Sequence, residues 1–362
     1  MFSIQNTLTS SEDAALKDNT VGTICLFQRG HAEIESCKEL IKELERSSRS
    51  TNIKHEYDPD ILSVGNSTSL TMGKLVVDQQ PRRLPSTVYS NIVPLSERQL
   101  KMTGKFTIKA PSDKKDCSAF GVVFLPGGRI VVGDDSNREM KLFTEKGDFK
   151  FELKLTDASC DLCSIDNNTV AVTLDEVKII CIVNVGDSTL TVSSKIKIPK
   201  LDEDCFGVTY HNDYFTVGTN KSLYSVPESG GEPKKLLTIR SNCLHLASNQ
   251  KNGHVFASIN TTNPNEMTVI RLSNDTSTDI LKVGVVKGTT GIDVDRQGNL
   301  YVCGYSSNNV LQMSGDGRNI RELLTSSDGI EHPRAISVWE DRMVITNESE
   351  DQINFVHLFQ LV

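Results

Sequence analysis

The sequence predicts a mostly β fold built from six similar units, and three observations support this. Residues 101–362 repeat a pattern of apolar strand, polar turn, second apolar strand and two further strand-like runs. Gly, Asn or Asp occupies the first turn of each copy, where a tight hairpin requires positive φ. The copies recur about every forty residues with four strands each, which is typical of propeller blades. We therefore expect a six-bladed β-propeller over residues 101–362.

The clearest copy has its first strand at 291–294, a turn at 296–299 and its second strand at 300–303. The first strands of the six copies start at Gly121, Leu162, Gly207, Leu244, Gly291 and Ala335. An ordinary β-sandwich is the alternative, but a sandwich does not require copies that stay in phase.

The last copy lacks its outermost strand, while a spare strand-like run lies upstream at 105–109. An open seam would leave an exposed sheet edge, which β proteins avoid. We therefore expect residues 105–109 to complete the last blade and close the ring. Removal of either end of 101–362 should then open the whole domain.

The chain before residue 101 has a different character. Residues 10–50 are predicted to form a short α-helical coiled-coil segment, in which a narrow apolar stripe lies between charged flanks. The stripe consists of Ile34, Cys37, Ile41 and Leu44. We expect it to pair with a second helix, either that of another copy in a homo-oligomer or a related helix, and packing on the propeller is the alternative. Residues 51–100 are predicted to be a proline-containing linker with one strand-like run at 74–77.

Composition narrows the class of protein. The formal net charge is −8, which disfavours non-specific binding to nucleic acid. No apolar window is long enough to span a membrane, and the N-terminus lacks the features of a secretory signal. The nine cysteines include one isolated Cys-x-x-Cys at 160–163, so we expect reduced thiols, a cytoplasmic location and no structural zinc.

Two copies resemble the NHL repeat, at 291–303 and 121–134, and residues 131–138 resemble the strand and Asp-containing loop of that family. The order of parts resembles the C-terminal half of tripartite-motif proteins with NHL propellers. The resemblance implies a scaffold that reads substrates for a ubiquitin ligase. The cysteine spacings do not match a RING or B-box, so ligase activity is not implied for this polypeptide.

Loops between second and third strands share one end of a propeller with the connections between blades. Acidic residues outnumber basic ones in these loops, whereas RNA recognition needs a positive groove. We therefore expect a protein partner that carries Lys or Arg, and RNA is disfavoured. The predicted partner-binding residues are Asp134, Asp135, Arg138, Asp175, Glu176, Lys221, Asn308, Asn309, Glu348 and Glu350.

An enzymatic function is the alternative, because six-bladed propellers also occur as metal-dependent lactonases. Asp116, Asp161 and Asp204 precede first strands and could offer oxygen ligands to a cation such as calcium. The histidines, however, occur singly, at positions 31, 55, 211, 245, 254, 332 and 357. We therefore predict a non-catalytic interaction protein without metal or cofactor. A lactonase-like hydrolase and an RNA-binding propeller are the alternatives.

Overall fold

The computed structural model describes residues 51–56, 74–79 and 99–362, except 199, 200, 202, 262, 264–266, 274, 275, 283 and 285. The chain divides into two units, Met1–Ile92 and Val93–Val362. In the first unit, β1 (Thr51–Glu56) pairs antiparallel with β2 (Lys74–Gln79), which contains the strand-like run at 74–77. The predicted coiled-coil stripe, Ile34, Cys37, Ile41 and Leu44, lies outside the described residues. Within the described part there is no helix with the length and hydrophobicity needed to cross a membrane.

The second unit consists of six four-stranded antiparallel sheets, the blades. Blade 1 contains β4 (Ala119–Leu125), β5 (Arg129–Asp134), β6 (Glu139–Thr144) and β7 (Phe149–Lys154). Blade 2 contains β8 (Ser159–Asp166), β9 (Thr169–Leu174), β10 (Ile179–Val185) and β11 (Leu190–Lys197). Blade 3 contains β12 (Cys205–His211), β13 (Tyr214–Thr219), β14 (Ser222–Pro227) and β15 (Lys234–Thr238).

The other three blades follow the same order, with one exception. Blade 4 contains β16 (Cys243–Ser248), β17 (Val255–Ile259), β18 (Met267–Ser273) and β19 (Thr276–Lys282). Blade 5 contains β20 (Thr289–Val294), β21 (Asn299–Gly304), β22 (Asn309–Ser314) and β23 (Ile320–Leu324), and the 3-10 helix η3 (Ser326–Asp328) follows it. Blade 6 contains β24 (Pro333–Trp339), β25 (Arg342–Asn347), β26 (Phe355–Leu361) and, from far upstream, β3 (Leu100–Thr107).

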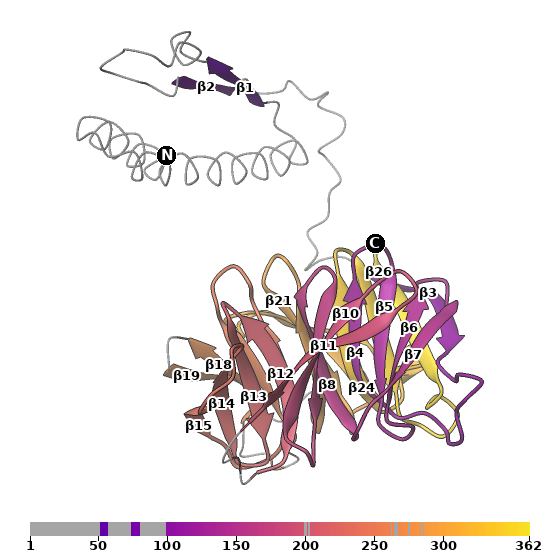
Figure 1. Ribbon diagram of the computed structural model, residues 1–362. Coiled ribbons are helices and arrows are strands. Elements are labelled where there is room, and N and C mark those ends of the chain that lie inside the picture. The colour runs from indigo at the N-terminus through magenta and orange to yellow at the C-terminus, as the bar shows by residue number, and fades with distance from the viewer. Residues whose placement is uncertain are drawn as a thin grey trace. The chain divides into compact units, whose positions relative to one another are not determined.

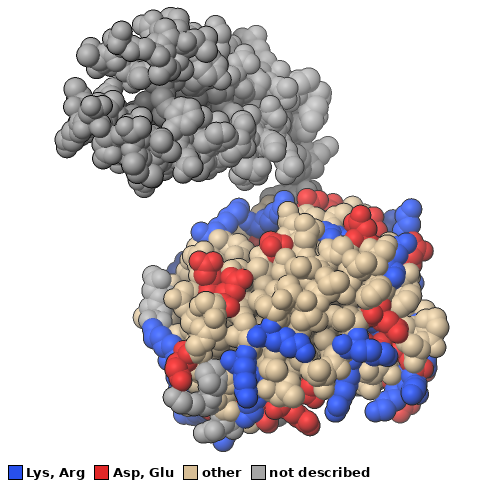
Figure 2. All heavy atoms as spheres, viewed as in Figure 1, with Lys and Arg blue, Asp and Glu red and all other residues tan. Residues whose placement is uncertain are grey.

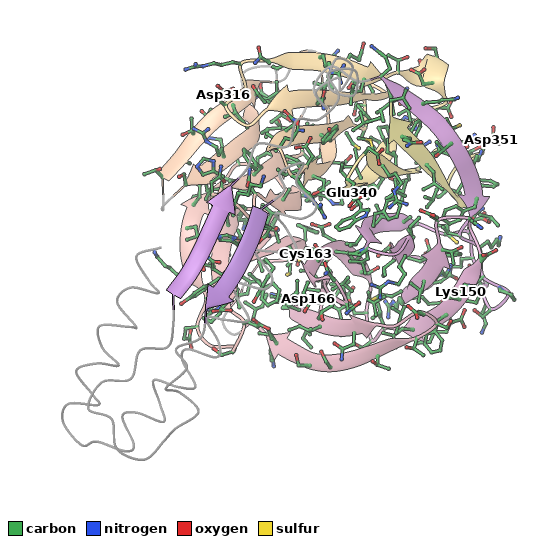
Figure 3. All side chains as sticks on the ribbon, turned by 90° about the horizontal axis from the view of Figure 1, so that it is seen from above. Lys150, Cys163, Asp166, Asp316, Glu340 and Asp351 are labelled. Carbon is green, nitrogen blue, oxygen red and sulfur yellow. The ribbon has the colours of Figure 1, made fainter. Side chains whose placement is uncertain are left out.

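The blades form a closed ring (Figures 1 and 3). The first strand of each blade contacts the first strands of both neighbouring blades, and β24 of blade 6 contacts β4 of blade 1. These six inner strands surround a central channel. The predicted six-bladed β-propeller is therefore confirmed.

The hydrophobic core lies between blades rather than within them. One buried cluster joins each pair of neighbouring blades, including the pair that closes the ring. In the closing cluster, Phe124 and Phe143 of blade 1 pack with Val344 and Val356 of blade 6. Since apolar burial is the main stabilising contribution, a blade depends on both neighbours.

Two glycines of the repeat allow the inner strands to approach closely. A Cβ at Gly121 would lie 2.9 Å from the backbone nitrogen of Leu162 in blade 2. A Cβ at Gly291 would lie 2.8 Å from the Cα of Ala335 in blade 6. These distances leave no room for a side chain, which explains why glycine begins these copies.

The ring is closed by β3, which pairs antiparallel with β26 from Leu100 opposite Leu361 to Thr107 opposite Phe355. Two backbone hydrogen bonds between Gln99 and Val362, of 3.1 and 2.8 Å, extend this pairing. The strand expected at 105–109 overlaps only the end of β3, which starts at Leu100. The two ends of the propeller sequence therefore share one sheet.

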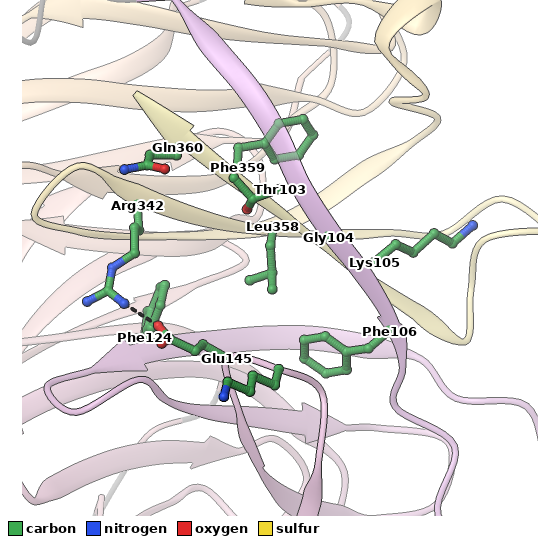
Figure 4. Close-up of a pocket in the computed structure, with 11 residues that line it drawn as sticks. Thr103, Gly104, Lys105, Phe106, Phe124, Glu145, Arg342, Leu358, Phe359 and Gln360 are labelled. Atoms are coloured by element: carbon green, nitrogen blue, oxygen red, sulfur yellow. Dashed lines mark hydrogen bonds and ion pairs between the residues drawn. The ribbon is translucent and has the colours of Figure 1, made fainter. Parts of the chain in front are cut away.

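Side chains also cross the closing seam (Figure 4). A groove of about 500 Å³ lies there, lined by β3, β26 and blade 1. Arg342 of blade 6 forms an ion pair with Glu145 of blade 1, and its guanidinium lies 5.0 Å from the ring centroid of Phe124. Phe106 of β3 packs against Phe143, with ring centroids 5.3 Å apart. Strand pairing and side-chain packing thus hold blades 6 and 1 together.

Candidate functional site

A pocket of about 220 Å³ occupies the central channel and is lined by residues of all six inner strands. Asp161 and His245 lie at its inner end, in β8 and β16. Gln250, Arg296 and Glu340 lie at its rim, beyond the ends of inner strands. In the view along the channel, Glu340 lies near the centre of the ring (Figure 3). An engineered cavity of about 150 Å³ can hold benzene, so this pocket is large enough for a small organic molecule.

The strand registers show which positions of the six blades are equivalent. In each blade, one inner-strand residue pairs with the equivalent residue of the second strand, which is Val172 in blade 2. These six inner-strand residues are Val122, Leu162, Val208, Leu246, Ile292 and Ile336. The residue before each of them is small in four blades: Gly121, Gly207, Gly291 and Ala335. In blades 2 and 4 it is instead Asp161 and His245.

These two exceptional residues bind each other. Nδ1 of His245 lies 2.9 Å from Oδ1 of Asp161, and both side chains are almost fully buried. Blade 3 separates them in the ring, and there Gly207 has no side chain to obstruct the contact. A Cβ at Gly207 would lie only 3.1 Å from the carbonyl carbon of His245. The pair therefore forms because the same position is Asp, Gly and His in three successive blades.

The environment of Asp161 determines the tautomer of His245. Backbone N–H groups of Leu162, Val208 and Leu246 donate to its carboxylate at 2.9, 2.9 and 3.3 Å. A carboxylate that accepts these bonds also accepts from imidazole, so Nδ1 carries a proton. Among the described residues, Nε2 of His245 has no hydrogen-bond partner, and it is not one of the fully buried unpartnered atoms. A free imidazole nitrogen therefore faces the pocket.

Asp293 contributes a second carboxylate to the pocket, from β20. Burial raises the pKa of Asp293 to about 6, and the nearby Asp161 acts in the same direction. Hydrogen bonds from the backbone N–H groups of Val338 and Val294, both 2.7 Å, oppose this shift, as does a bond from Ser337. The bond to Val338 joins blades 5 and 6, so this carboxylate also links neighbouring blades.

The rim already holds a cation against an aromatic ring. The guanidinium of Arg296 lies 4.5 Å from the ring centroid of Trp339. Its Nη1 is 3.7 Å from Oε1 of Glu340, and both charged side chains are about half exposed. An exposed pair of this kind contributes little stability, so Arg296 can reorient when a ligand enters.

The remaining polar groups of the pocket are poor nucleophiles. Burial raises the pKa of the Cys163 thiol well above its ordinary value, which keeps it protonated. Ser248 donates to the carbonyl of Tyr210 at 2.9 Å and receives a bond from Thr209. Ser337 accepts from the backbone N–H of Phe124 at 3.1 Å. The arrangement therefore favours proton transfer by His245 over covalent catalysis.

The structure places the predicted partner-binding residues in the loops between second and third strands, or at the strand ends beside them, on the end of the blades opposite to the pocket rim. Two of them are buried. Asp134 is fully buried, and its Oδ2 lies 2.6 Å from Nζ of Lys141. Asn309 is also buried and donates to Glu322 at 2.6 Å. These two side chains support the loops and are not available to a partner.

Several other predicted residues make contacts within the loops. Arg138 is exposed, and its Nη2 lies 4.0 Å from Oδ1 of Asp157. Glu348 lies 3.6 Å from Arg334, and Asn308 accepts the backbone N–H of His332 at 2.9 Å. Burial raises the pKa of the partly buried Asp135, with a smaller contribution from Asp134. The exposed members are Arg138, Glu176, Lys221 and Glu350.

Asp175 is the centre of a negative group on these loops. Burial raises its pKa to about 6, and the charges of Asp204, Asp157 and Glu176 add to the shift. One compensating interaction is the backbone N–H of Cys205, which donates to its carboxylate at 3.2 Å. On the side of the molecule seen in Figure 2, by contrast, Lys and Arg are interspersed with Asp and Glu.

The described residues contain one group of three side chains close enough to ligate a metal, Asp113, Cys117 and Asp134. Nζ of Lys141 lies 2.6 Å from carboxylate oxygens of both aspartates and 3.5 Å from the sulfur of Cys117. The ammonium thus takes the place of a cation. It forms a buried ion pair, and the group does not fit a metal site.

The aspartates predicted as alternative calcium ligands do not come together. Asp116 is exposed and bonds to Lys109 at 2.8 Å, whereas Asp161 is in the channel and Asp204 is exposed on a loop. The donors on Asp161 are backbone N–H groups and imidazole, which are not the surroundings of a hard cation.

Comparisons with known proteins identify the fold. A β-propeller repeat family (SBBP) matches residues 289–312, in blade 5. No curated protein matches the sequence. A catalytically inactive histidine-to-alanine variant of virginiamycin B lyase from Staphylococcus aureus, solved with quinupristin, is similar in structure, with 11% identity and a TM-score of 0.53 over 73% of this chain and 100% of that one.

Two further solved structures share the fold. The calcium-binding protein regucalcin from Agrobacterium tumefaciens is 14% identical, with a TM-score of 0.52 over 69% of this chain and 92% of its own. A luciferin-regenerating enzyme is 12% identical, with a TM-score of 0.52 over 73% and 95%. At these identities the likeness establishes the propeller fold. The resemblance to tripartite-motif proteins remains a prediction.

The prediction that this chain is not an enzyme is contradicted. Its fold is one that enzymes use, as the lyase and the luciferin-regenerating enzyme show. His245 occurs singly in the sequence, but the ring brings it to Asp161 across blade 3. The sequence carried a signal for this pair: alignment of the six copies would have shown Asp and His where the others have Gly or Ala.

The carboxyl group of Asp293 should make stability depend on pH. Its pKa in the folded state is about 6, against 3.8 for the ordinary group, so the folded protein holds a proton that the unfolded chain has lost. Stability therefore falls as pH rises from about 4 to 6, by up to about 3 kcal/mol for this group. Urea unfolding between pH 4 and 7 should show this decline in the wild type and a smaller one in Asp293→Asn. Asp351→Asn, at an exposed loop, is the matched control, and identical pH slopes in all three proteins would contradict the assignment.

Proposed function

We propose that this protein is an enzyme that transfers a proton to or from a small molecule, with His245 as general base. The molecule binds in the pocket of the central channel, called the axial pocket below. One observation supports this most strongly. A buried imidazole is oriented by a carboxylate through Nδ1, while its Nε2 is left unpartnered beside a pocket of ligand size. A purely structural histidine would be expected to satisfy both ring nitrogens.

The two residues of the pair have distinct roles. Asp161 is a positioning residue, because it fixes the tautomer and orientation of the ring through its bond to Nδ1 of His245. His245 is the catalytic residue, because its Nε2 can accept a proton from a bound molecule and later return it. Such positioned proton transfer contributes roughly 10²- to 10⁴-fold to a rate.

The comparisons support this proposal without identifying the reaction. One protein of the same fold is a lyase whose histidine-to-alanine variant is catalytically inactive. For the present chain, the proposal rests on the geometry of its own channel.

Turnover of an unfractionated small-molecule extract tests the proposal. Wild-type protein should consume at least one compound, detected by mass spectrometry, and His245→Gln should slow that consumption by about 100-fold or more. His254→Gln, in the same blade but outside the pocket, is the control and should retain activity. If no compound distinguishes wild type from His245→Gln, general-base catalysis is excluded.

A second candidate function is recognition of a basic protein segment by the loop face, the end of the propeller that carries the loops with Asp157, Asp175 and Asp204. Burial raises the pKa of Asp175, the charges of Asp204, Asp157 and Glu176 add to the shift, and a partner's Lys or Arg would offset this negative charge. Pairing of residues 10–50 between chains, as predicted, would join two such faces. Calorimetry should show that the wild type binds a lysine-rich peptide. The affinity should fall about fivefold in Glu176→Gln, because an ion pair between Glu176 and a peptide lysine is lost. Equal binding to a glutamate-rich peptide would contradict this proposal.

A further inference from the structure

The charged groups around the axial pocket are mainly acidic. Asp161, Asp293 and Glu340 are among the residues that line it. Among the described residues that line it, Arg296 is the one Lys or Arg, and it is engaged by Glu340 and stacked on Trp339. The pocket therefore carries more negative than positive charge.

The hydrogen-bonding groups of the pocket point to the same kind of ligand. The free nitrogen of His245 carries a lone pair when the ring is neutral, and the carboxylates of Asp293 and Glu340 can accept further bonds. Donors are fewer, because the hydroxyls of Thr209 and Ser248 are already engaged. A ligand with several N–H donors would satisfy acceptors that the protein leaves open.

The apolar part of the lining suits an organic body attached to such donors. Phe124, Ile292 and Trp339 contribute to the walls. The face of Trp339 already attracts a guanidinium group, with Arg296 at 4.5 Å from the ring centroid. Aromatic faces stabilise cations when partly removed from water.

We propose that the axial pocket binds a small organic cation, a protonated amine, with its ammonium group near Asp293, between His245 at the inner end of the pocket and Glu340 at the rim. This inference rests on the proposed function, since it names the class of molecule on which His245 would act. Binding of a cation also explains why Asp293, a half-buried carboxylate, is retained beside the pocket.

Other classes of ligand fit less well. An anion would meet three carboxylates and a single engaged arginine. A metal ion would need several ligand atoms close together, and in the part of the chain that the structure describes the one such group is Asp113, Cys117 and Asp134, outside the pocket.

Three probes of the same size separate these possibilities: benzylammonium, benzyl alcohol and benzoate, titrated calorimetrically into the full chain at pH 8. This pH lies above the range in which Asp293 takes up a proton. We expect benzylammonium to bind at least about tenfold more tightly than the other two, and the preference to shrink about fivefold in Glu340→Gln and in Asp293→Asn. Glu340 is at the exposed rim, so its variant stays informative if Asp293→Asn proves unstable.

Asp351→Asn removes an equal charge at the periphery of the ring (Figure 3) and should leave the preference unchanged. Equal binding of the three probes, preferential binding of benzoate, or no binding of benzylammonium overturns the proposal. The outcome is separate from that of the turnover experiment. Selective cation binding without a His245-dependent reaction would leave the ligand class standing and remove the catalytic role.

Discussion

The pairing of β3 with β26 is the constraint on which the rest of the structure depends. Each hydrophobic cluster of the propeller lies between two blades, so no blade is complete without both neighbours. The chain meets this requirement at its ends by supplying the outer strand of blade 6 from upstream of blade 1. Opening that sheet would expose the seam core around Phe124 and Phe143 as well as two unpaired strand edges.

Ring closure also creates the candidate site. The pocket is lined by the inner strands of all six blades, including β4 and β24 on the two sides of the seam, and Gly207 leaves the space through which Asp161 reaches His245. The same carboxylate receives backbone bonds from blades 3 and 4. It therefore stabilises the ring and orients the imidazole at once. The acidic lining that favours a cation follows from the use of such carboxylates as links between blades.

Local patterns allowed most of the fold to be predicted, because strand alternation and turn residues are encoded within each copy. The closing strand was placed too late, at 105–109, since the exposed polar residues of the early part of β3 conceal its alternation. Asp134 was predicted to face a partner because sequence alone does not reveal that it is buried beside Lys141. The pair of Asp161 and His245 was missed because the two residues are 84 positions apart in the sequence. Comparison of equivalent positions among the copies, with Gly or Ala in four of them, would have indicated it.

The most direct test of this account is the Nδ1 proton of His245, observed by NMR in chains that begin at residue 99 or at residue 109. His245→Gln provides the assignment. A proton held by a buried carboxylate exchanges slowly and gives a distinct resonance, and the account predicts it in the chain that keeps β3. In the shorter chain, which lacks β3 and the buried Ile108, the resonance should disappear together with cooperative unfolding. Its persistence in the shorter chain would contradict the claim that strand closure builds the site.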